Sequence, residues 1–253
     1  MGREVVRAEV AQAMKMMLSV LVSSWNQLSS LKLVMASYGC QTMKRCEVVV
    51  SDDGSDDGTK DWVESLGLDF DVRFVGRKHE GYGLAQAWNE AAAVARGERL
   101  LFTNADILHA PGSFEAHMEV EGVGAGLVAG IGMKGVEKLD EDVVTRWDVV
   151  EKVRRDNPLP GNLDLAEMTD PNFNVVGVWS SNLSVSAAMF HEVGGFSERF
   201  FGKWGCEDYD LADRLARHDV VFEWVRHAKA FHMWHPVAAY AKEMGGCEEY
   251  ING

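Results

Sequence analysis

The sequence predicts an α/β fold, with a Rossmann-like, mostly parallel central sheet flanked by helices in a single domain. Short β-branched or apolar segments alternate with segments whose apolar residues recur at helical spacing. Three successive strand-helix-strand units of this kind favour a parallel sheet with helices on both faces. The chain has 253 residues, of which 47% are hydrophobic, and this is enough to bury the core of one large domain.

The first half of the chain contains the clearest alternation. Strands are predicted at 17–22, 47–51, 72–75 and 99–103, with helices at 28–38, 59–66 and 84–95. Asp52-Asp53-Gly54-Ser55 ends the second strand, because these residue types favour turns. Gly97 closes the third helix.

The alternation weakens in the second half. The elements predicted there are a helix from Pro111 to 119, a strand at 127–133, a charged helix at 137–155, a strand at 182–186, a turn at Gly194-Gly195, a helix at 207–217, and strands at 220–225 and 229–231. The segment 156–174 holds three of the five prolines and is predicted to be a long loop. Loops of this length in a compact domain are usually lids or binding segments, so we expect an acceptor lid here.

The charge balance restricts the partners. Lys and Arg number 25 against 39 Asp and Glu, and the net charge of −14 repels nucleic acids and anionic lipid surfaces. We therefore expect no nucleic-acid partner, whereas an anionic small ligand stays compatible if a metal cation bridges it to the protein.

The sequence lacks apolar stretches of membrane-spanning or signal-peptide length. We therefore expect no transmembrane segment and a cytoplasmic location. Residues 1–15 are expected to form a loose helix before the first strand, and no function is assigned to them. The four cysteines, Cys40, Cys46, Cys206 and Cys247, fit no zinc-binding spacing, and free thiols are expected.

Polar residues follow several of the predicted strands. Ser24, Asp53 and Asp106 each lie where a strand ends, and in open α/β sheets ligands bind beyond the carboxyl ends of the strands. These side chains are therefore expected to face one crevice.

The acidic loop from Asp52 to Thr59 has three interpretations. It can be a solvated turn. It also comes close to an EF-hand calcium loop, through Asp53, Ser55, Asp57, Gly58 and Glu64. A strand-like segment precedes it where an EF-hand needs a helix, which argues against calcium. The third interpretation is that Asp53 accepts a hydrogen bond from a ligand N–H group in the crevice.

The segment Asn104-Ala105-Asp106 also stands at a strand end. An isolated Asp there is often the cap of the next helix. It is equally suited to a divalent cation, because such a cation needs few carboxylates when a diphosphate supplies the remaining oxygens. His232 and His235 follow a late strand, and an imidazole can complete a manganese site, although a single histidine is more often simply packed.

The most informative part of the second half runs from Gly194 to Asp210. Its acids Glu207 and Asp208 fit the first turn of a helix, where the helix dipole favours negative charge. The preceding Trp204-Gly205 fits a sugar site, in which an aromatic ring packs against the sugar and a carboxylate acts as base.

Taken together and in this order, the segments resemble family 2 glycosyltransferases, inverting nucleotide-sugar-dependent enzymes of the GT-A fold. The resemblance runs from Leu18 to about Pro236, and its last part is also similar to galactosyltransferase C-terminal regions. Its motifs are the opening strand with Ser23-Ser24-Trp25-Asn26, the acidic loop 50–59, the helix start 83–89, Gly194-Gly195-Phe196, and Trp204-Gly205-Cys206-Glu207-Asp208. Asn104 stands where the family's Asp-x-Asp motif has its first acid, and Ser23-Ser24-Trp25 replaces Pro-Thr-Tyr.

The resemblance implies a donor-binding half at about 17–109 and an acceptor-binding, catalytic half at about 110–253. Asp53 would recognise the base of the donor. The other residues implied in donor binding are Ser23, Ser24, Trp25, Asn104 and Ala105. Asp106 would bind Mn²⁺ or Mg²⁺, with His232 as its expected partner and His235 as the runner-up.

On the acceptor side, the resemblance makes Asp208 the catalytic base and assigns Trp204, Gly205 and Glu207 to acceptor or sugar binding. The expected reaction transfers a sugar, with inversion, from a nucleoside diphosphate sugar, with UDP-sugars favoured. The expected acceptor is a glycan, a lipid-linked molecule or a small molecule, and a lipid-linked acceptor would place the protein at the periphery of a membrane.

Other functions remain open at this point. A nucleotidyltransferase shares this type of fold, but the glycine-rich basic motif after the first strand is missing. A calcium- or sugar-binding module without catalysis, or a homologue that has lost activity, is the other alternative. Metal-dependent heat stabilisation by UDP, but not by calcium alone, distinguishes the nucleotide site from the EF-hand.

Overall fold

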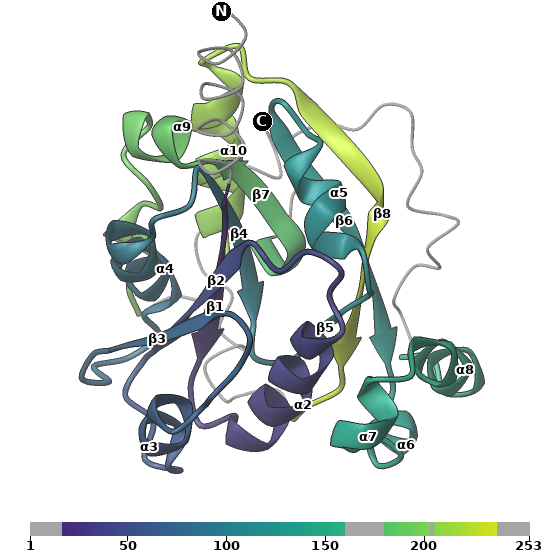
Figure 1. Ribbon diagram of the computed structural model, residues 1–253. Coiled ribbons are helices and arrows are strands. Elements are labelled where there is room, and N and C mark those ends of the chain that lie inside the picture. Colours follow the sequence, from purple (N-terminus) through teal and green to yellow (C-terminus); the bar gives the residue numbers. More distant parts are fainter. Residues whose placement is uncertain (1–16, 160–179, 203–204, 237–253) are drawn as a thin grey trace, which may run out of the picture.

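The computed structural model describes residues 17–159, 180–202 and 205–236 (Figure 1). Their strands form one eight-stranded sheet with the order β3-β2-β1-β4-β7-β6-β8-β5. The strands are β1 (Leu18–Ser24), β2 (Cys46–Asp52), β3 (Asp71–Gly76), β4 (Arg99–Asn104), β5 (Ile107–His109), β6 (Val123–Ile131), β7 (Leu183–Ser186) and β8 (Phe222–Met233).

The four strands of the first half are parallel, as predicted. β1 lies between β2 and β4, and β3 pairs with the outer side of β2. β1 and β2 are buried along their whole length, which explains their continuous apolar sequences. Because the strands are parallel, the polar residues that follow β1, β2 and β4 meet at one edge of the sheet.

The second half extends this sheet with mixed pairing. β7 pairs antiparallel with β4 and β6, β8 runs parallel to β6, and β5 pairs antiparallel with β8. The prediction of two strands at 220–225 and 229–231 was wrong, because a single strand β8 spans both. Its register against β6 shifts between Val225 and Lys229, and this bulge accounts for the polar interruption in the sequence.

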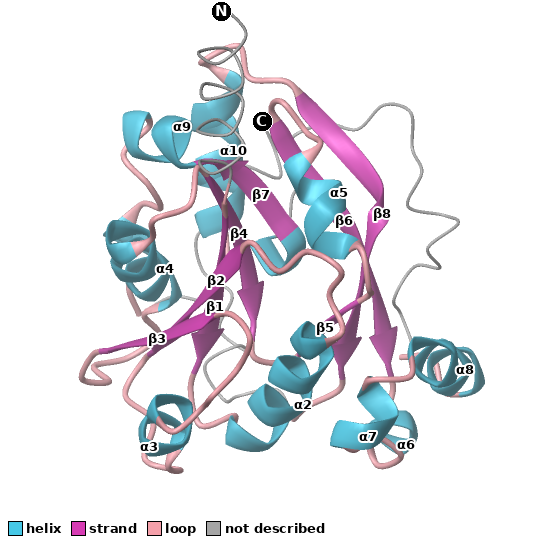
Figure 2. Ribbon diagram, viewed as in Figure 1, coloured by secondary structure: helices cyan, strands magenta, loops and turns pink. Residues whose placement is uncertain are grey.

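Helices cover both faces of the sheet (Figure 2). They are α2 (Leu28–Gly39), α3 (Thr59–Glu64), α4 (Leu84–Val94), α5 (Ser113–Met118), α6 (Met133–Val136), α7 (Glu141–Val144), α8 (Trp147–Asp156), α9 (Ala187–Glu192) and α10 (Glu207–Ala216), with 3₁₀ turns η2 (Ser180–Asn182) and η3 (Glu198–Phe200). Val20 and Val22 of β1 belong to the core cluster shared with α2, whereas Leu21 belongs to the cluster shared with α4, α9 and α10. The alternation along β1 thus builds one core on each face.

One predicted helix needs correction, and two elements were missed. The charged helix expected at 137–155 consists instead of two short helices, α7 and α8. Asp140 starts α7, because its backbone is extended and its carboxylate accepts a hydrogen bond from Val143 N. Arg146, whose φ of −110° and ψ of 85° are not helical, separates α7 from α8. β5 was not predicted, because its three residues are too few for a periodic signal. The six-residue helix α9, which directly follows β7, was not predicted either.

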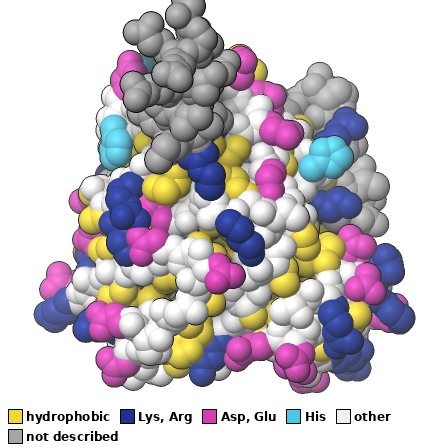
Figure 3. All heavy atoms as spheres, viewed as in Figure 1, with side chains coloured by type: hydrophobic (Ala, Val, Ile, Leu, Met, Phe, Trp, Pro, Cys, Tyr) yellow, Lys and Arg dark blue, Asp and Glu magenta, His cyan; other side chains and the backbone are white. Residues whose placement is uncertain are grey.

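The prediction of free thiols holds for Cys40 and Cys46 and is wrong for Cys206, which is disulfide-bonded. The helix expected at 1–15 and most of the expected lid, from residue 160 on, lie outside the described residues. Within the described part of the chain, none of the helices is long and apolar enough to cross a membrane. On the face seen in Figure 3, acidic and basic side chains are interspersed rather than gathered by sign.

Candidate functional site

The carboxyl end of β1 is the centre of the candidate site. Ser24 O accepts a hydrogen bond from Asp53 N, and Ser23 O accepts one from Ala105 N, both at 2.9 Å. The chain segments that follow β2 and β4 are therefore held on the two sides of β1. This places Asp53 on one side of β1 and Asp106 on the other.

Asp106 forms a cluster with His232 and His235. Their potential ligand atoms all lie within 4.8 Å of one another. The Nε2 atom of His235 is 3.1 Å from Asp106 Oδ2, and that of His232 is 3.6 Å away. Gln27 Nε2 donates to the same oxygen at 3.2 Å. This cluster is the only group of three or more potential His, Cys, Asp or Glu metal ligands among the described residues.

The pairing of β5 with β8 assembles the cluster. Ile107 is the partner of His232 in this pair, and Met233 N donates to Asp106 O at 2.9 Å. Asp106 and the two histidines, which are far apart in the sequence, thus lie together at one edge of the sheet. β5 was not predicted from the sequence, yet it is the element that brings the histidines to Asp106.

The cluster has the electrostatics of a cation site. Burial alone would raise the pKa of the Asp106 carboxyl, but hydrogen bonds and charge from His232 and His235 outweigh it and hold the pKa well below its ordinary value. The hydrogen bond to Asp106 raises the pKa of His235. Asp106 Oδ1 is buried and accepts no hydrogen bond within the described residues. One unpaired carboxylate oxygen and two imidazoles form a donor set that suits Mn²⁺.

Asp53 faces two cationic or polar side chains from the loop after β3. His79 Nδ1 lies 3.0 Å from Asp53 Oδ2, and Arg77 Nε lies 3.5 Å from Oδ1. Burial raises the pKa of Asp53 even though His79 and Arg77 oppose the shift. The imidazole of His79 also stacks on Trp25, with ring centroids 4.4 Å apart and an interplanar angle of 11°. Trp25 and Asp53 thus contact the same imidazole.

Two other acids of the loop 52–59, Asp52 and Asp57, hold its backbone. Asp52 accepts hydrogen bonds from Gly54 N and Ser55 N, and Asp57 accepts from Leu28 N at the start of α2 and from Thr59 N at the start of α3. The loop is not an EF-hand, because the strand β2 precedes it where an EF-hand needs a helix.

Asn104 connects β1 to the segment before β7. Its Oδ1 accepts from Ser23 Oγ at 2.7 Å, and its Nδ2 donates to Ser181 Oγ at 3.3 Å. The amide of Asn104 thus bridges the hydroxyl groups of Ser23 and Ser181. The Oγ of Ser24 is buried and has no hydrogen-bond partner among the described residues.

Asp208 approaches the same region through η2. Its Oδ2 accepts hydrogen bonds from Ser180 N at 3.3 Å and from Ser180 Oγ at 3.2 Å. Ser180 adjoins Ser181, the partner of Asn104, so a short chain of contacts leads from Ser23 to Asp208. Burial raises the pKa of the Asp208 carboxyl.

Glu207 is more deeply buried than its neighbour. Tyr82 Oη donates to Glu207 Oε1 at 3.4 Å, while Oε2 is buried and unpaired within the described part of the chain. Burial and the charge of Asp208 raise the pKa of Glu207 to about 7. The preceding Gly205 and Cys206 have φ values of 97° and 75°, a left-handed backbone that starts α10 in this orientation. Trp204 lies outside the described residues.

Sequence reasoning missed several residues at this site: Gln27, Arg77, His79, Tyr82 and Ser180. Arg77 and His79 directly follow β3, so the strand-end argument that singled out Asp53 could have found them. Ser180 and Tyr82 carry no such signal, because only the packing of η2 and α10 gives them their partners.

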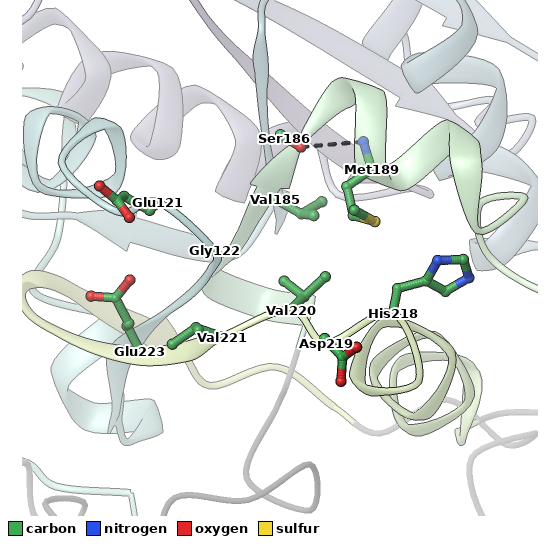
Figure 4. A pocket seen from close by; sticks show the side chains of 10 residues that line it. All are labelled: Glu121, Gly122, Val185, Ser186, Met189, His218, Asp219, Val220, Val221 and Glu223. Carbon is green, nitrogen blue, oxygen red and sulfur yellow. Dashed lines mark hydrogen bonds between the residues drawn. The ribbon is translucent and has the colours of Figure 1, made fainter.

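A hollow of about 340 Å³ lies elsewhere, between the starts of β6 and β8 and the end of β7 (Figure 4). Gly122 and Val221 line it, whereas His232 stands near the far end of the twelve-residue β8. At about 3.3 Å per residue, roughly 30 Å separates the hollow from Asp106. The hollow therefore contributes nothing to the site around β1.

Comparisons with known proteins agree with this architecture. Residues 19–166, more than half of the chain, match the family model described as glycosyl transferase family 2. Residues 165–236 match the model described as the N-terminal domain of galactosyltransferase. The fold and the family match define a GT-A glycosyltransferase domain. The chain belongs to glycosyl transferase family 2.

Curated relatives include validoxylamine A glucosyltransferase of Streptomyces hygroscopicus subsp. jinggangensis, which is 31% identical over 221 residues, 81% of this chain and 52% of that protein. Chondroitin synthase of Escherichia coli is 24% identical, with coverage of 87% and 35%. The chain thus spans about half the length, or less, of these two relatives.

Solved structures share the fold at low sequence identity. Staphylococcus aureus TarS in complex with UDP-GlcNAc has a TM-score of 0.69 at 16% identity and covers 94% of this chain and 64% of its own. The mannosyltransferase PcManGT from Pyrobaculum calidifontis, in complex with GDP-Man and Mn²⁺, has a TM-score of 0.57 at 20% identity, with coverage of 89% and 59%.

Proposed function

We propose that the protein transfers a sugar from a UDP-sugar to an acceptor hydroxyl, with inversion at the anomeric carbon. The observation that carries this proposal is the cluster of Asp106, His232 and His235 beside the end of β1, with Asp53 on its other side. A diphosphate bound at the cluster would leave the base of the donor on the Asp53 side and its sugar on the Asp208 side.

The surroundings of Asp53 favour a pyrimidine base. Its Oδ1 is buried, and a Cβ added at Gly83 would lie 2.9 Å from it, so this oxygen is enclosed. Only Oδ2 is then left to accept a hydrogen bond from a base. Uracil offers one ring N–H, whereas guanine would present two N–H donors to a carboxylate, and one of them would lack a partner.

The cation would be held by Asp106, His232 and His235. The buried, unpaired Oδ1 of Asp106 and the two imidazoles match the ligands that manganese accepts, and magnesium is the alternative. When bound, the ion would neutralise the negative charge of the diphosphate leaving group. The complex of PcManGT with GDP-Man and Mn²⁺ supports a divalent metal in a domain of this fold.

Asp208 would act as the general base. It would take the proton of the acceptor hydroxyl as that oxygen bonds to the anomeric carbon and the bond to the diphosphate oxygen breaks. The hydrogen bonds from Ser180 to Oδ2 fix the orientation of the carboxylate. Glu207, Gly205 and Trp204 would bind the acceptor, and Glu207 keeps an unpaired Oε2 for a hydroxyl group.

The two halves of the chain would share this work, with donor binding at about 17–109 and acceptor binding and catalysis at about 110–253. The acceptor would be a glycan, a lipid-linked molecule or a small molecule. A cytoplasmic location, with peripheral membrane contact for a lipid-linked acceptor, stays part of the proposal.

A panel of UDP-, GDP- and dTDP-sugars, tested by thermal shift with and without Mn²⁺, checks the proposal. We expect the largest stabilisation from a UDP-sugar with Mn²⁺, and slow release of UDP from that donor when water replaces the acceptor. Stabilisation by Ca²⁺ alone would instead favour a calcium module. Formation of a nucleotide sugar from a nucleoside triphosphate and a sugar phosphate would indicate a nucleotidyltransferase.

A further inference from the structure

His79 makes the two contacts that a donor base is expected to make. Its Nδ1 lies 3.0 Å from Asp53 Oδ2 and 3.1 Å from Asp53 O. Both of these atoms are acceptors, so Nδ1 carries the proton and donates it. The face of the ring stacks on Trp25. Proteins bind a flat heterocycle by the same two interactions, namely a hydrogen bond from a ring N–H to a carboxylate and stacking of the ring on an aromatic side chain.

The two rings leave no room for a third between them. Their centroids are 4.4 Å apart, which is already the spacing of a single stacked pair. Asp53 offers no other route, because Oδ1 is buried against Arg77 and Gly83. A base that pairs with Asp53 and stacks on this face of Trp25 therefore needs the place that the imidazole occupies.

The loop around His79 is held while the imidazole itself can turn outward. Arg77 N donates to Asp52 O at 3.0 Å, and a Cβ at Gly54 would lie 2.4 Å from His79 N, so the backbone packs closely against the loop after β2. The imidazole is 32% exposed, and the neighbouring side chains Lys78 and Glu80 are 85% and 58% exposed. Because the imidazole already reaches solvent, we expect a rotation of the His79 side chain to release Asp53 Oδ2.

From this geometry we infer that His79 is an intramolecular competitor of the donor base. In the free protein the imidazole occupies the position of the base beside Asp53 and Trp25, and it leaves this position when the nucleotide binds. The inference rests on the proposed function, since it concerns the same donor site. The competition lowers the apparent affinity for the nucleotide, because only a fraction of the free protein molecules have His79 turned away from Asp53.

The test measures binding of UDP with Mn²⁺ by calorimetry to the full chain and to His79→Ala. We expect His79→Ala to bind UDP on the order of tenfold more tightly. His79→Phe keeps the stacked ring without the N–H group, and we expect an intermediate gain. Lys78→Ala and Glu80→Ala are the matched controls in the same loop and should bind as the unchanged protein does.

The outcomes separate the inference from the function on which it rests. Weaker binding by His79→Ala would mean that His79 clamps the bound base, and equal binding would mean that it does not compete; either result overturns the inference and leaves the proposed function standing. If neither protein binds UDP, GDP or dTDP with Mn²⁺, the donor site is wrong and both proposals fall. Thermal unfolding of each variant without ligand verifies that it is folded.

Discussion

Replacement of Asp106 by Asn is the sharpest test of the proposed cation site. The substitution keeps the size of the side chain and removes its charge, while His232 and His235 stay in place. The amide can still accept a hydrogen bond from Gln27 at the position of Oδ2, so the metal-free fold should be retained. The substitution specifically removes the negative charge of the carboxylate and one of its two oxygens as a metal ligand, of which Oδ1 is buried and unpaired among the described residues.

The size of the effect follows from linkage. With Mn²⁺ at a hundred times its dissociation constant, in the presence of UDP, binding stabilises the folded state by about 2.7 kcal/mol. For a chain of this size that corresponds to an increase in Tm of about 5–10 °C. If Asp106→Asn weakens metal binding by about a hundredfold, the same Mn²⁺ concentration contributes only about 0.4 kcal/mol, or about 1 °C.

The assay is a thermal melt of each variant with and without Mn²⁺ at fixed UDP, and each Tm is compared with that of the same variant without metal. Glu64→Gln is the matched control, because it neutralises an acid of the rejected calcium loop whose side chain is 52% exposed. It should keep the full shift. A full Mn²⁺ shift in Asp106→Asn, or its loss in Glu64→Gln, would refute the assignment of the metal to the cluster.

Two further predictions concern catalysis and stability. Asp208→Asn should lower turnover on the order of a hundredfold or more and leave UDP binding unchanged, measured by UDP release and calorimetry; near-normal turnover would remove Asp208 as the base. Burial would raise the pKa of Glu47, but hydrogen bonds from Ser19, Arg96 and Arg73 lower it overall. The Glu47 carboxylate therefore stabilises the folded state fully above the pKa of about 4.3 that it has in the unfolded chain. This stabilisation is lost as the pH falls through the lower pKa of the folded state. Glu47→Gln should therefore cost about 3 kcal/mol at pH 7 in denaturant unfolding, with a difference from the unchanged protein that narrows below about pH 4; a difference independent of pH would contradict this reasoning.

The parallel half of the sheet was predictable because its signals are local. The strands around Val20, Val49 and Leu101 are buried on both faces, so continuous apolar residues mark them, and turn residues such as Gly54 mark their ends. The rule that ligands bind beyond the carboxyl ends of the strands then predicts that Asp53 and Asp106 lie at one edge of the sheet.

The sequence by itself thus determined the class of fold and the acids that follow its parallel strands. Both can be predicted because the apolar pattern of a strand and the residue types of a turn are local features of the sequence. Only the tertiary structure decided which side chains those acids meet. Asp106 meets His232 and His235 because the three-residue β5 pairs with the end of β8, and Asp53 meets His79 because the loop after β3 packs on Gly54. Such contacts join segments distant in the chain, and no local periodicity encodes the distance between them.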